Sequence, residues 1–535
     1  MILAVRKTKL FRATVKTICD IYLWLTKAVM PNKSRNSNNE RSTTIMKKTT
    51  VMSLLMITAL AVSACGADID TTSETTEITT EAGETNNTDK PDGQPPQDGQ
   101  GVPGAQDGQG GPGGEMGQPP EGGQGGPGAP GGFGGSGEVN QGTAANTIDT
   151  DGTYTAETYT STGDDENALR VDGAEVTLTD ITVDKASGAT SNTEDGDFYG
   201  MNAALLATNG ANVTITGATV TSSAQNGNGV FSYGEGTVVN ISDSTITTTA
   251  DNSGGIQTTG GGTTNATNLT VKTSGNSAAA IRSDRGGGIV VVNKGTYESN
   301  GYNSPAVYST ADITVKNATL TANNSEALVI EGQNSITLEN CDVTGNMSDT
   351  QGSSSEENVH NVMIYQSMSG DAEVGTSNFS MTGGTLTSKN GDMFYVTNTH
   401  CTLTLSDVKI VNQDSDGVLM RVTGNSASHG WGNAGSNGAQ VDATFDGQTV
   451  EGDIVVDTIS TLNLTLTNGS SFTGTINIID NAEGGTAVDN NAVVTVEKGS
   501  TWTLTGNCTI SSLDNQGTIN YNGYTITLTD GAILK

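Results

Sequence analysis

The amino-acid sequence predicts an all-β solenoid, a fold in which short strands of successive coils stack on one another. Composition is the first indication, because the 535 residues include 71 glycines and only 15% charged residues, and Thr, Asn, Ser and Gly dominate after residue 150. The apolar stripes of amphipathic helices are missing there. The second indication is a strand-like pattern that recurs at a nearly constant step, which is typical of repeat architectures.

Each repeat begins with an alternating segment that bends at Asn, Asp or Gly and continues as a second short alternating segment. Alternation with period two indicates a half-buried strand, and Asn, Asp and Gly tolerate the backbone of a bend. The apolar residue at the third position is expected to point into the core. This position is occupied by Leu178, Ile215, Ile241, Ala266, Val292, Val315, Leu338, Met381, Leu405 and Phe445.

Another strand is expected between these segments, because a second apolar run recurs with the same step. Most steps in both series lie between 22 and 26 residues. Steps of 37, 43 and 40 residues, which follow Leu178, Leu338 and Leu405, leave room for an inserted loop or an extra coil. The core residues expected in the second series are Leu205, Phe231, Ile256, Ile281, Val307, Val329, Ile364, Phe394 and Leu419.

The repeats over residues 145–535 resemble the right-handed parallel β-helix of the pectate-lyase-like superfold. The segment 499–519, GSTWTLTGNCTISSLDNQGTI, is similar to the repeat of autotransporter passenger β-helices, so 440–535 are expected to form passenger-like coils. Those passengers are largely adhesins and surface structures, which implies a surface role. The chain departs from them because no membrane barrel follows the repeats before Lys535, and a lipid anchor is expected to provide the attachment instead.

Residues 46–64 have the form of a signal peptide, in which lysines precede an apolar run that is too short to span a bilayer. The run ends in VSAC at 62–65 and resembles the lipobox of bacterial lipoproteins. The resemblance implies cleavage before Cys65, a lipid on its thiol and attachment to the cell membrane facing outward. The alternative is a secretion signal without lipid. Because this signal starts afresh at Met46, residues 1–45 are interpreted as an over-extended reading frame.

Residues 65–144 are expected to be a disordered linker, first rich in Thr and Glu and then in Gly, Pro and Gln. Such a composition cannot bury a core. Only Asp20 and Glu40 of the 58 acidic residues precede Cys65, and eleven of the 24 Lys and Arg do, so 56 acidic and 13 basic residues follow, a net charge of about −43. This charge excludes nucleic acid as a partner, and we expect a monomer that meets the membrane only through its lipid.

Three widely spaced cysteines, Cys341, Cys401 and Cys508, lie in strand-like segments. Sparse cysteines do not form a disulfide framework, so they are interpreted as small buried hydrophobes. The three histidines of the chain lack the spacing of metal ligands. Acidic loops at 164–166, 194–197 and 356–357 offer oxygen ligands for calcium, but none has the spacing of a known calcium loop. No cofactor is therefore assigned.

The superfold also contains polygalacturonases and pectate lyases, so the resemblance leaves enzymatic activity open. Residues 398–400 read Asn-Thr-His where polygalacturonases have Asn-Thr-Asp, and His429-Gly430 has no pair of aspartates nearby. Neither Arg-Ile-Lys nor the Arg-x-Pro-x-x-Arg motif of the lyases occurs. No catalytic residue is assigned. The segment RSDRGGG at 282–288 is interpreted as a surface turn, with an anionic-sugar contact or a lyase base as the alternative.

In the second series, the residue after each expected core residue points to the opposite face of its strand. Gln257, Arg282, Tyr308, Tyr365 and Tyr395 occupy such positions and form the candidate ligand-binding face. Tyrosine rings stack on sugar rings, and Gln and Arg bond to hydroxyls or carboxylates. The hypothesis is a shallow groove for an extended polysaccharide. The alternative is that a loop, or the insertion at 346–360, covers this face.

The sequence as a whole predicts a lipid-anchored surface protein that acts in adhesion or binds a polysaccharide, including glycans of a host or a neighbouring cell. A polysaccharide lyase or glycoside hydrolase is the alternative. A passive or ice-binding surface is suggested by pairs of the form Thr-x-Thr, but uneven coils argue against a flat threonine lattice.

Overall fold

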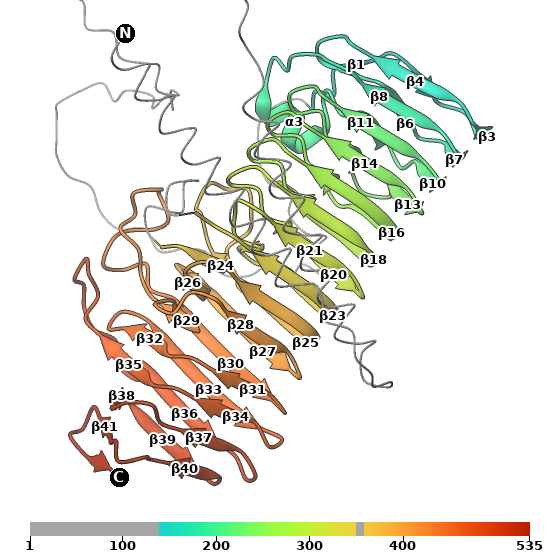
Figure 1. Cartoon of the computed structure of the whole chain (residues 1–535). Helices are drawn as coiled ribbons and strands as arrows, with labels where there is room; N and C mark the ends of the chain where they lie inside the picture. Colours follow the sequence, from blue (N-terminus) through green and yellow to red (C-terminus); the bar gives the residue numbers. More distant parts are fainter. Residues whose placement is uncertain (1–138, 349–357) are drawn as a thin grey trace, which may run out of the picture. The chain divides into compact units, whose positions relative to one another are not determined.

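The computed structural model describes residues 139–348 and 358–535, and these form parallel strands that stack in chain order (Figure 1). The predicted all-β parallel solenoid is confirmed. The upstream segment 1–45, the signal peptide 46–64, Cys65 and the linker up to residue 138 lie outside the described residues. No helix in the part of the chain that the structure describes has the length and apolar character that a bilayer crossing needs.

One sheet contains sixteen strands, one from almost every coil, and is called the site sheet below. Its strands pair in parallel except for the last pair, which is antiparallel. The strands are β2 (Thr147–Ile148), β6 (Leu169–Asp172), β9 (Leu205–Thr208), β12 (Val230–Tyr233), β15 (Ile256–Thr259), β17 (Ile281–Ser283), β19 (Val307–Ser309), β22 (Leu328–Glu331), β24 (His360–Tyr365), β26 (Asp392–Thr397), β29 (Met420–Val422), β32 (Ile454–Asp457), β35 (Ile476–Ile479), β38 (Cys508–Ile510), β41 (Ile526–Leu528) and β42 (Ile533–Leu534).

A second sheet contains twenty strands and is called the bent sheet, because most coils cross it, bend and continue as a second row of the same sheet. The first row consists of β3 (Gly152–Thr155), β7 (Glu175–Thr179), β10 (Asn212–Thr216), β13 (Val238–Ser242), β16 (Gly262–Thr273), β18 (Gly288–Ser299), β20 (Asp312–Lys316), β23 (Ser335–Gly345), β25 (Thr376–Ser388), β27 (His400–Ser406), β30 (Gln440–Asp446), β33 (Thr461–Thr467), β36 (Ala492–Val496) and β39 (Ser512–Asn515). The second row adds β4 (Thr158–Ser161), β8 (Thr182–Lys185), β11 (Thr219–Ser222), β14 (Thr245–Thr248), β21 (Thr319–Ala322) and β28 (Lys409–Asn412).

Two small sheets and one helix complete the described elements. The four-stranded sheet consists of β31 (Thr449–Glu451), β34 (Ser471–Thr473), β37 (Thr501–Thr503) and β40 (Thr518–Asn520), and the two-stranded sheet of β1 (Thr143–Ala144) and β5 (Glu166–Asn167). The helix is α3 (Thr193–Tyr199). The first strand thus begins two residues before the predicted boundary at 145.

The core follows the predicted first series. Each residue of that series pairs in register with the next, from Leu178 through Ile215 to Phe445, and all of them are buried. Cys341, Cys401 and Cys508 are also buried and unbridged, as predicted for small hydrophobes. The bend between the rows is made by residues with positive φ, among them Asp180 at 53°. Asn, Asp and Gly adopt this conformation at little cost, which explains their recurrence.

The predicted second series is correct in its strands and wrong in part of its register. Phe231, Val329 and Leu419 were expected in the core. Their neighbours Val230, Leu328 and Met420 instead pair in register with core residues of the adjacent strands, and we call each such column of paired core residues a core ladder. A slip of one residue moves a side chain to the other face of the sheet. In these runs both neighbouring positions are apolar, so alternation could not identify the core face.

The three long steps correspond to insertions that leave the coils at turns beside the site sheet. The first insertion, 186–204, contains α3. The second step holds residues 346–359, of which 349–357 lie outside the described residues, and the loop 366–375. The third contains the loop 423–439. The alternative of an extra coil is wrong, because the core ladder runs through all three steps without a gap.

The unevenness of the coils lies in their turns, and the sheets themselves keep a uniform register. Seven threonines stack in register on the second row of the bent sheet, from Thr158 to Thr319. The neighbouring outward column is interrupted by the ion pair of Lys272 and Glu298, at 3.0 Å. Charged side chains therefore break the flat array.

The core ladder supplies a stability test. Leu338→Ala removes a fully buried side chain from β23 and is expected to lower the free energy of unfolding by about 2–5 kcal/mol, because a cavity remains. Thr337→Ala, on the opposite face of the same strand, is expected to change it by about 0.5 kcal/mol or less. Urea unfolding followed by circular dichroism measures both. Equal losses in the two variants would contradict the alternation.

Candidate functional site

A cavity of about 450 Å³ lies on the outer face of the site sheet. Strands β17, β19, β22 and β24 form its floor with Arg282, Tyr308, Val329, Met363 and Tyr365. The turns next to these strands and the three insertions supply the rest of the wall. The contributions of the insertions are Asp197 and Phe198 from α3, Asp371 from the loop 366–375, and His429 and Trp431 from the loop 423–439.

Helix α3 forms where its local sequence caps both ends. The Asn192 side chain accepts a hydrogen bond from the Glu194 amide, and Gly200 ends the helix at a φ of 80°. Side chains of strand β15 in the site sheet then hydrogen-bond to backbone carbonyls of the helix. Gln257 Nε2 donates to the Asp197 carbonyl and Thr259 Oγ1 donates to the Phe198 carbonyl, both at 2.6 Å. These contacts set the positions of both side chains at the cavity.

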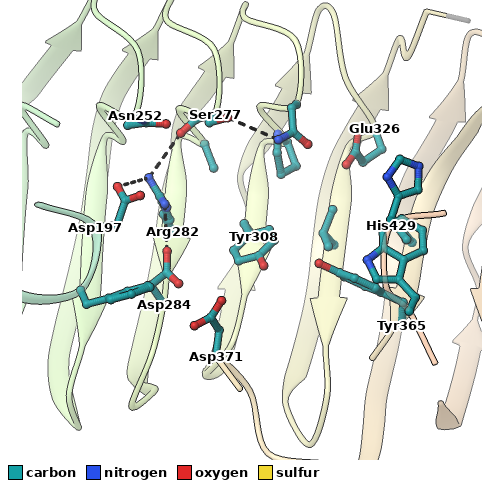
Figure 2. A pocket seen from close by; sticks show the side chains of 17 residues that line it. Asp197, Asn252, Ser277, Arg282, Asp284, Tyr308, Glu326, Tyr365, Asp371 and His429 are labelled. Carbon is teal, nitrogen blue, oxygen red and sulfur yellow. Dashed lines mark hydrogen bonds and ion pairs between the residues drawn. The ribbon is translucent and has the colours of Figure 1, made fainter. Parts of the chain in front are cut away.

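Arg282 lies in a buried ion cluster at one side of the cavity (Figure 2). Its Nη1 is 3.1 Å from Asp197 Oδ1, and its Nη2 is 2.8 Å from Asp284 Oδ2. Nη1 also donates to the Ser277 carbonyl at 3.3 Å. The interpretation of RSDRGGG as a surface turn is wrong for its first part, because Arg282 and Asp284 are 9% and 5% exposed beneath α3. Residues 285 and 286 do form a turn at the surface.

Burial makes the carboxyl groups of this cluster hard to ionise. It raises the pKa of Asp284 to about 7, although Arg282 opposes the shift, and Asp197 and Asp371 add to it by repulsion. Burial also raises the pKa of Asp197. Burial of Arg282 opposes its charge, but the two carboxylates outweigh this and raise its pKa. One guanidinium is thus shared by two carboxyl groups.

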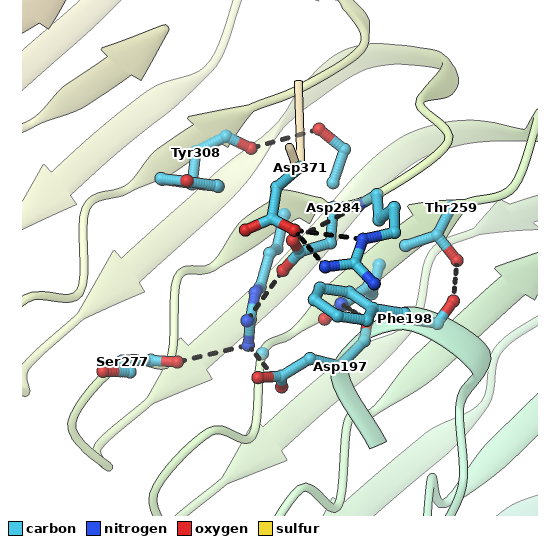
Figure 3. Close-up of polar contacts among 12 residues, drawn as sticks. Asp197, Phe198, Thr259, Ser277, Asp284, Tyr308 and Asp371 are labelled. Carbon is cyan, nitrogen blue, oxygen red and sulfur yellow. Dashed lines mark hydrogen bonds and ion pairs between the residues drawn. The ribbon is translucent and has the colours of Figure 1, made fainter. Parts of the chain in front are cut away.

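A second ion pair joins the loop 366–375 to the site sheet. Arg285 Nη2 and Nε donate to Asp371 Oδ1 at 2.7 and 3.1 Å. The Arg285 guanidinium also lies 4.0 Å from the centre of the Phe198 ring, a cation–π contact. Figure 3 shows these polar contacts around Asp371 and Phe198. Loop, sheet and helix are therefore tied together at this rim.

Two tyrosines of the predicted face share one buried carboxylate. The hydroxyls of Tyr308 and Tyr365 donate to Glu331 Oε2 at 2.5 and 3.1 Å, and Ser367 Oγ donates to Oε1. Burial, and then the charge of Glu331, raises the pKa of both tyrosines well above its usual value. Both phenols stay protonated, and their rings are held in place.

The far wall of the cavity is aromatic. Tyr365 and Trp431 meet edge to face with ring centres 4.9 Å apart, and His429 lies 4.8 Å from Trp431. Tyr365 and His429 lie across Tyr308 from the Arg282 cluster (Figure 2). The arrangement has a charged side and an aromatic side.

The structure brings most of the predicted face together but covers it. Gln257, Arg282, Tyr308 and Tyr395 lie in one outward ladder, with Val329 and Met363 between the last two. Tyr365 lies two residues further along the same face of its strand. Gln257 and Tyr395 are 0% and 2% exposed and do not line the cavity. The alternative of a covered face is therefore correct at both ends of the ladder.

Several cavity residues were not predicted from the sequence. Asp371, Glu326 and Trp431 lie outside the strand pattern, and only the long steps indicated that insertions were present. Asp197 belongs to one of the acidic loops considered for calcium, but it binds Arg282 instead. Asn192 followed by acidic residues and Gly200 is a helix signal that could have identified α3.

Other groups considered from the sequence have structural partners. Asp164 and Asp165 accept hydrogen bonds from backbone amides of the neighbouring coil, both at 2.7 Å. The exposed His400 pairs with Asp442 at 3.2 Å. No group of three or more His, Cys, Asp or Glu that is suited to hold a metal occurs in 139–348 and 358–535. A smaller cavity of about 220 Å³ lies beside Arg421 and Asp457.

Comparison of the chain with protein-family models, with curated proteins and with solved structures found no match. The fold and the cavity are therefore the basis of the functional argument.

The ion cluster supplies a second stability test. Arg282→Ala leaves Asp197 and Asp284 buried without a counter-charge and is expected to lower the free energy of unfolding by about 3–5 kcal/mol. Arg285→Ala is the matched control, because its pair with Asp371 is about a quarter exposed, and a loss of about 1 kcal/mol is expected. Urea unfolding at pH 8 measures both losses. A loss in Arg282→Ala that is no larger than the loss in the control would show that the buried cluster does not stabilise the fold more than an exposed pair does.

Proposed function

We propose that the protein is a lipid-anchored surface β-helix that binds a saccharide in the cavity over the site sheet. The supporting observation is the composition of the cavity wall. Tyr308, Tyr365 and Trp431 offer aromatic rings, and Asn252 and Asn303 add amide groups to the lining. Rings of this kind pack against the apolar faces of sugars, while amides and carboxylates bond to their hydroxyls.

The size of the cavity narrows the proposal. A shallow groove for a long polysaccharide was expected, but α3 and the loops 366–375 and 423–439 line a cavity on the site sheet. The volume of about 450 Å³ is in the range of small-ligand pockets. We therefore favour recognition of a few sugar units, at the end or in a side branch of a polysaccharide, over a chain that lies flat along the solenoid.

Surface display is supported by the sequence alone. The signal peptide at 46–64, the lipobox that ends at Cys65 and the acidic and Gly-rich linker are the features of an anchored protein that holds its folded part away from the membrane. The likeness of 440–535 to autotransporter passengers favours a role in adhesion. The partner in this proposal is a glycan of a host or a neighbouring cell.

Cleavage of the bound saccharide is the second candidate function, and Asp284 is the observation that favours it. A carboxyl group with a pKa of about 7 suits a general acid at neutral pH. The carboxylate is held by Arg282 at 2.8 Å, and proton donation to a glycosidic oxygen requires release of that pair. Binding is therefore the first candidate, and new reducing ends after incubation with a bound oligosaccharide would identify cleavage.

The aromatic wall supplies the test of binding. A glycan array on the full chain, followed by calorimetry on the strongest ligand, is expected to yield an oligosaccharide whose affinity falls about tenfold or more in Trp431→Ala, because aromatic anchors dominate binding energy. Tyr524→Ala, an aromatic residue that is 39% exposed and outside the cavity, is the control with unchanged affinity. Binding that is insensitive to Trp431 would rule out this cavity.

The anchor supplies an independent test. Cys65→Ser removes the thiol that receives the lipid and is expected to move the protein from the membrane fraction to the medium of the producing cells, because one polar residue cannot hold an acidic chain at a bilayer. Incorporation of a labelled fatty acid measures the same step. Absence of the label from the unmodified chain, or the same labelling in the serine variant, would contradict lipid anchoring through Cys65 and favour the secretion signal without lipid.

A further inference from the structure

The cavity carries more negative than positive charge. Four carboxyl groups line it, against the single guanidinium of Arg282. Arg285, outside the lining, pairs with Asp371, which leaves a formal excess of two negative charges. The four carboxyl groups belong to Asp197, Asp284, Glu326 and Asp371. The raised pKa of Asp284 has burial as its main cause and repulsion by Asp197 and Asp371 as a further one. An anionic ligand would add to this repulsion, and a cationic ligand would relieve it.

The arginines near the cavity already have partners. Arg282 bonds to two carboxylates and to the Ser277 carbonyl. Arg285 is bound by Asp371 through two of its nitrogens. An anionic sugar would have to replace one of these carboxylates and leave it buried without a counter-charge, which is costly.

Glu326 is the cavity carboxylate that lacks a cationic partner. It lies in the turn before β22 and is 4% exposed. Its Oε2 accepts a hydrogen bond from Ser325 Oγ at 2.6 Å. No Lys or Arg among residues 139–348 and 358–535 forms an ion pair with it. Burial lowers the pKa of the neighbouring His360, which leaves that imidazole neutral near Glu326.

The aromatic side of the cavity also suits a cation. Tyr308, Tyr365 and Trp431 line the cavity together with Glu326, and their hydroxyl and ring contacts hold them in place. Aromatic faces attract cations through their quadrupole, and desolvation strengthens the attraction. A buried carboxylate without a counter-charge and aromatic rings therefore line the same space.

We propose that the cavity selects a saccharide with a free, protonated amino group, as in glucosamine units, over its N-acetylated or uronic-acid counterparts. The inference rests on the proposed saccharide binding and names the chemical class of that ligand. The ammonium group pairs with Glu326, and the sugar ring packs against Tyr365 and Trp431. Acetylation removes the charge and adds bulk at the buried carboxylate, and a uronate meets like charge.

The test compares three oligosaccharides on the full chain by isothermal titration calorimetry. The probes are a β-1,4-linked glucosamine tetramer, the matched N-acetylglucosamine tetramer and a galacturonate tetramer. The glucosamine tetramer is expected to bind about tenfold or more tightly than either of the others, because a buried charge pair is made only with it. Glu326→Gln keeps the side-chain shape and is expected to abolish this preference. Glu483→Gln, an exposed acid beside the smaller cavity, is expected to preserve it.

The outcomes separate this inference from the proposed function. Equal affinities, or a preference for the acetylated or galacturonate tetramer that depends on Trp431, would overturn the amino-sugar inference and leave saccharide binding in place. Failure of the tetramers and of every glycan on the array to bind would overturn both. The comparison of ligands on the unmodified chain decides the preference even if Glu326→Gln is poorly folded.

Discussion

The strict register of the parallel ladders is the constraint on which the rest of the structure depends. Each coil places an apolar residue directly over that of the previous coil, from Leu178 to Phe445, without a gap. A shift of one residue would move the whole set of core side chains to the solvent face. A coil with more residues than its neighbours must therefore carry the additional residues in a turn, because an insertion within a strand would shift the register.

This constraint explains why a site forms on the site sheet. The inserted residues lie in the turns before β9 and after β24 and β29, that is, at the ends of strands of this sheet. They return over its outer face as α3 and the loops 366–375 and 423–439, which line one cavity. Polar residues that would otherwise meet water are thereby buried. The regular solenoid is a scaffold, and the irregular segments give the cavity its chemistry.

Burial in turn decides what the charged groups do. Arg282 on an open sheet would be a free cation and a good contact for an anionic sugar. Beneath α3 it serves instead as counter-charge for Asp197 and Asp284, and the tyrosines serve Glu331. The low dielectric of the covered face strengthens these pairs and makes an uncompensated carboxylate costly. The uncompensated charge of the groups that line the cavity is therefore negative, although an arginine lies at one side of it.

The sequence by itself determined the solenoid, because the core is built from residues that repeat locally: alternation, the step and the Asn, Asp or Gly bend are visible without tertiary contacts. It also placed the three insertions through the long steps after Leu178, Leu338 and Leu405. The sequence did not determine which residues point into the core in uniformly apolar runs such as Ala-Leu-Val-Ile at 327–330, since both strand faces carry similar side chains there. Only the tertiary structure decided that the insertions cover one face and bring Asp197, Glu326, Asp371 and Trp431 together, because contacts between distant loops leave no periodic signal in the chain.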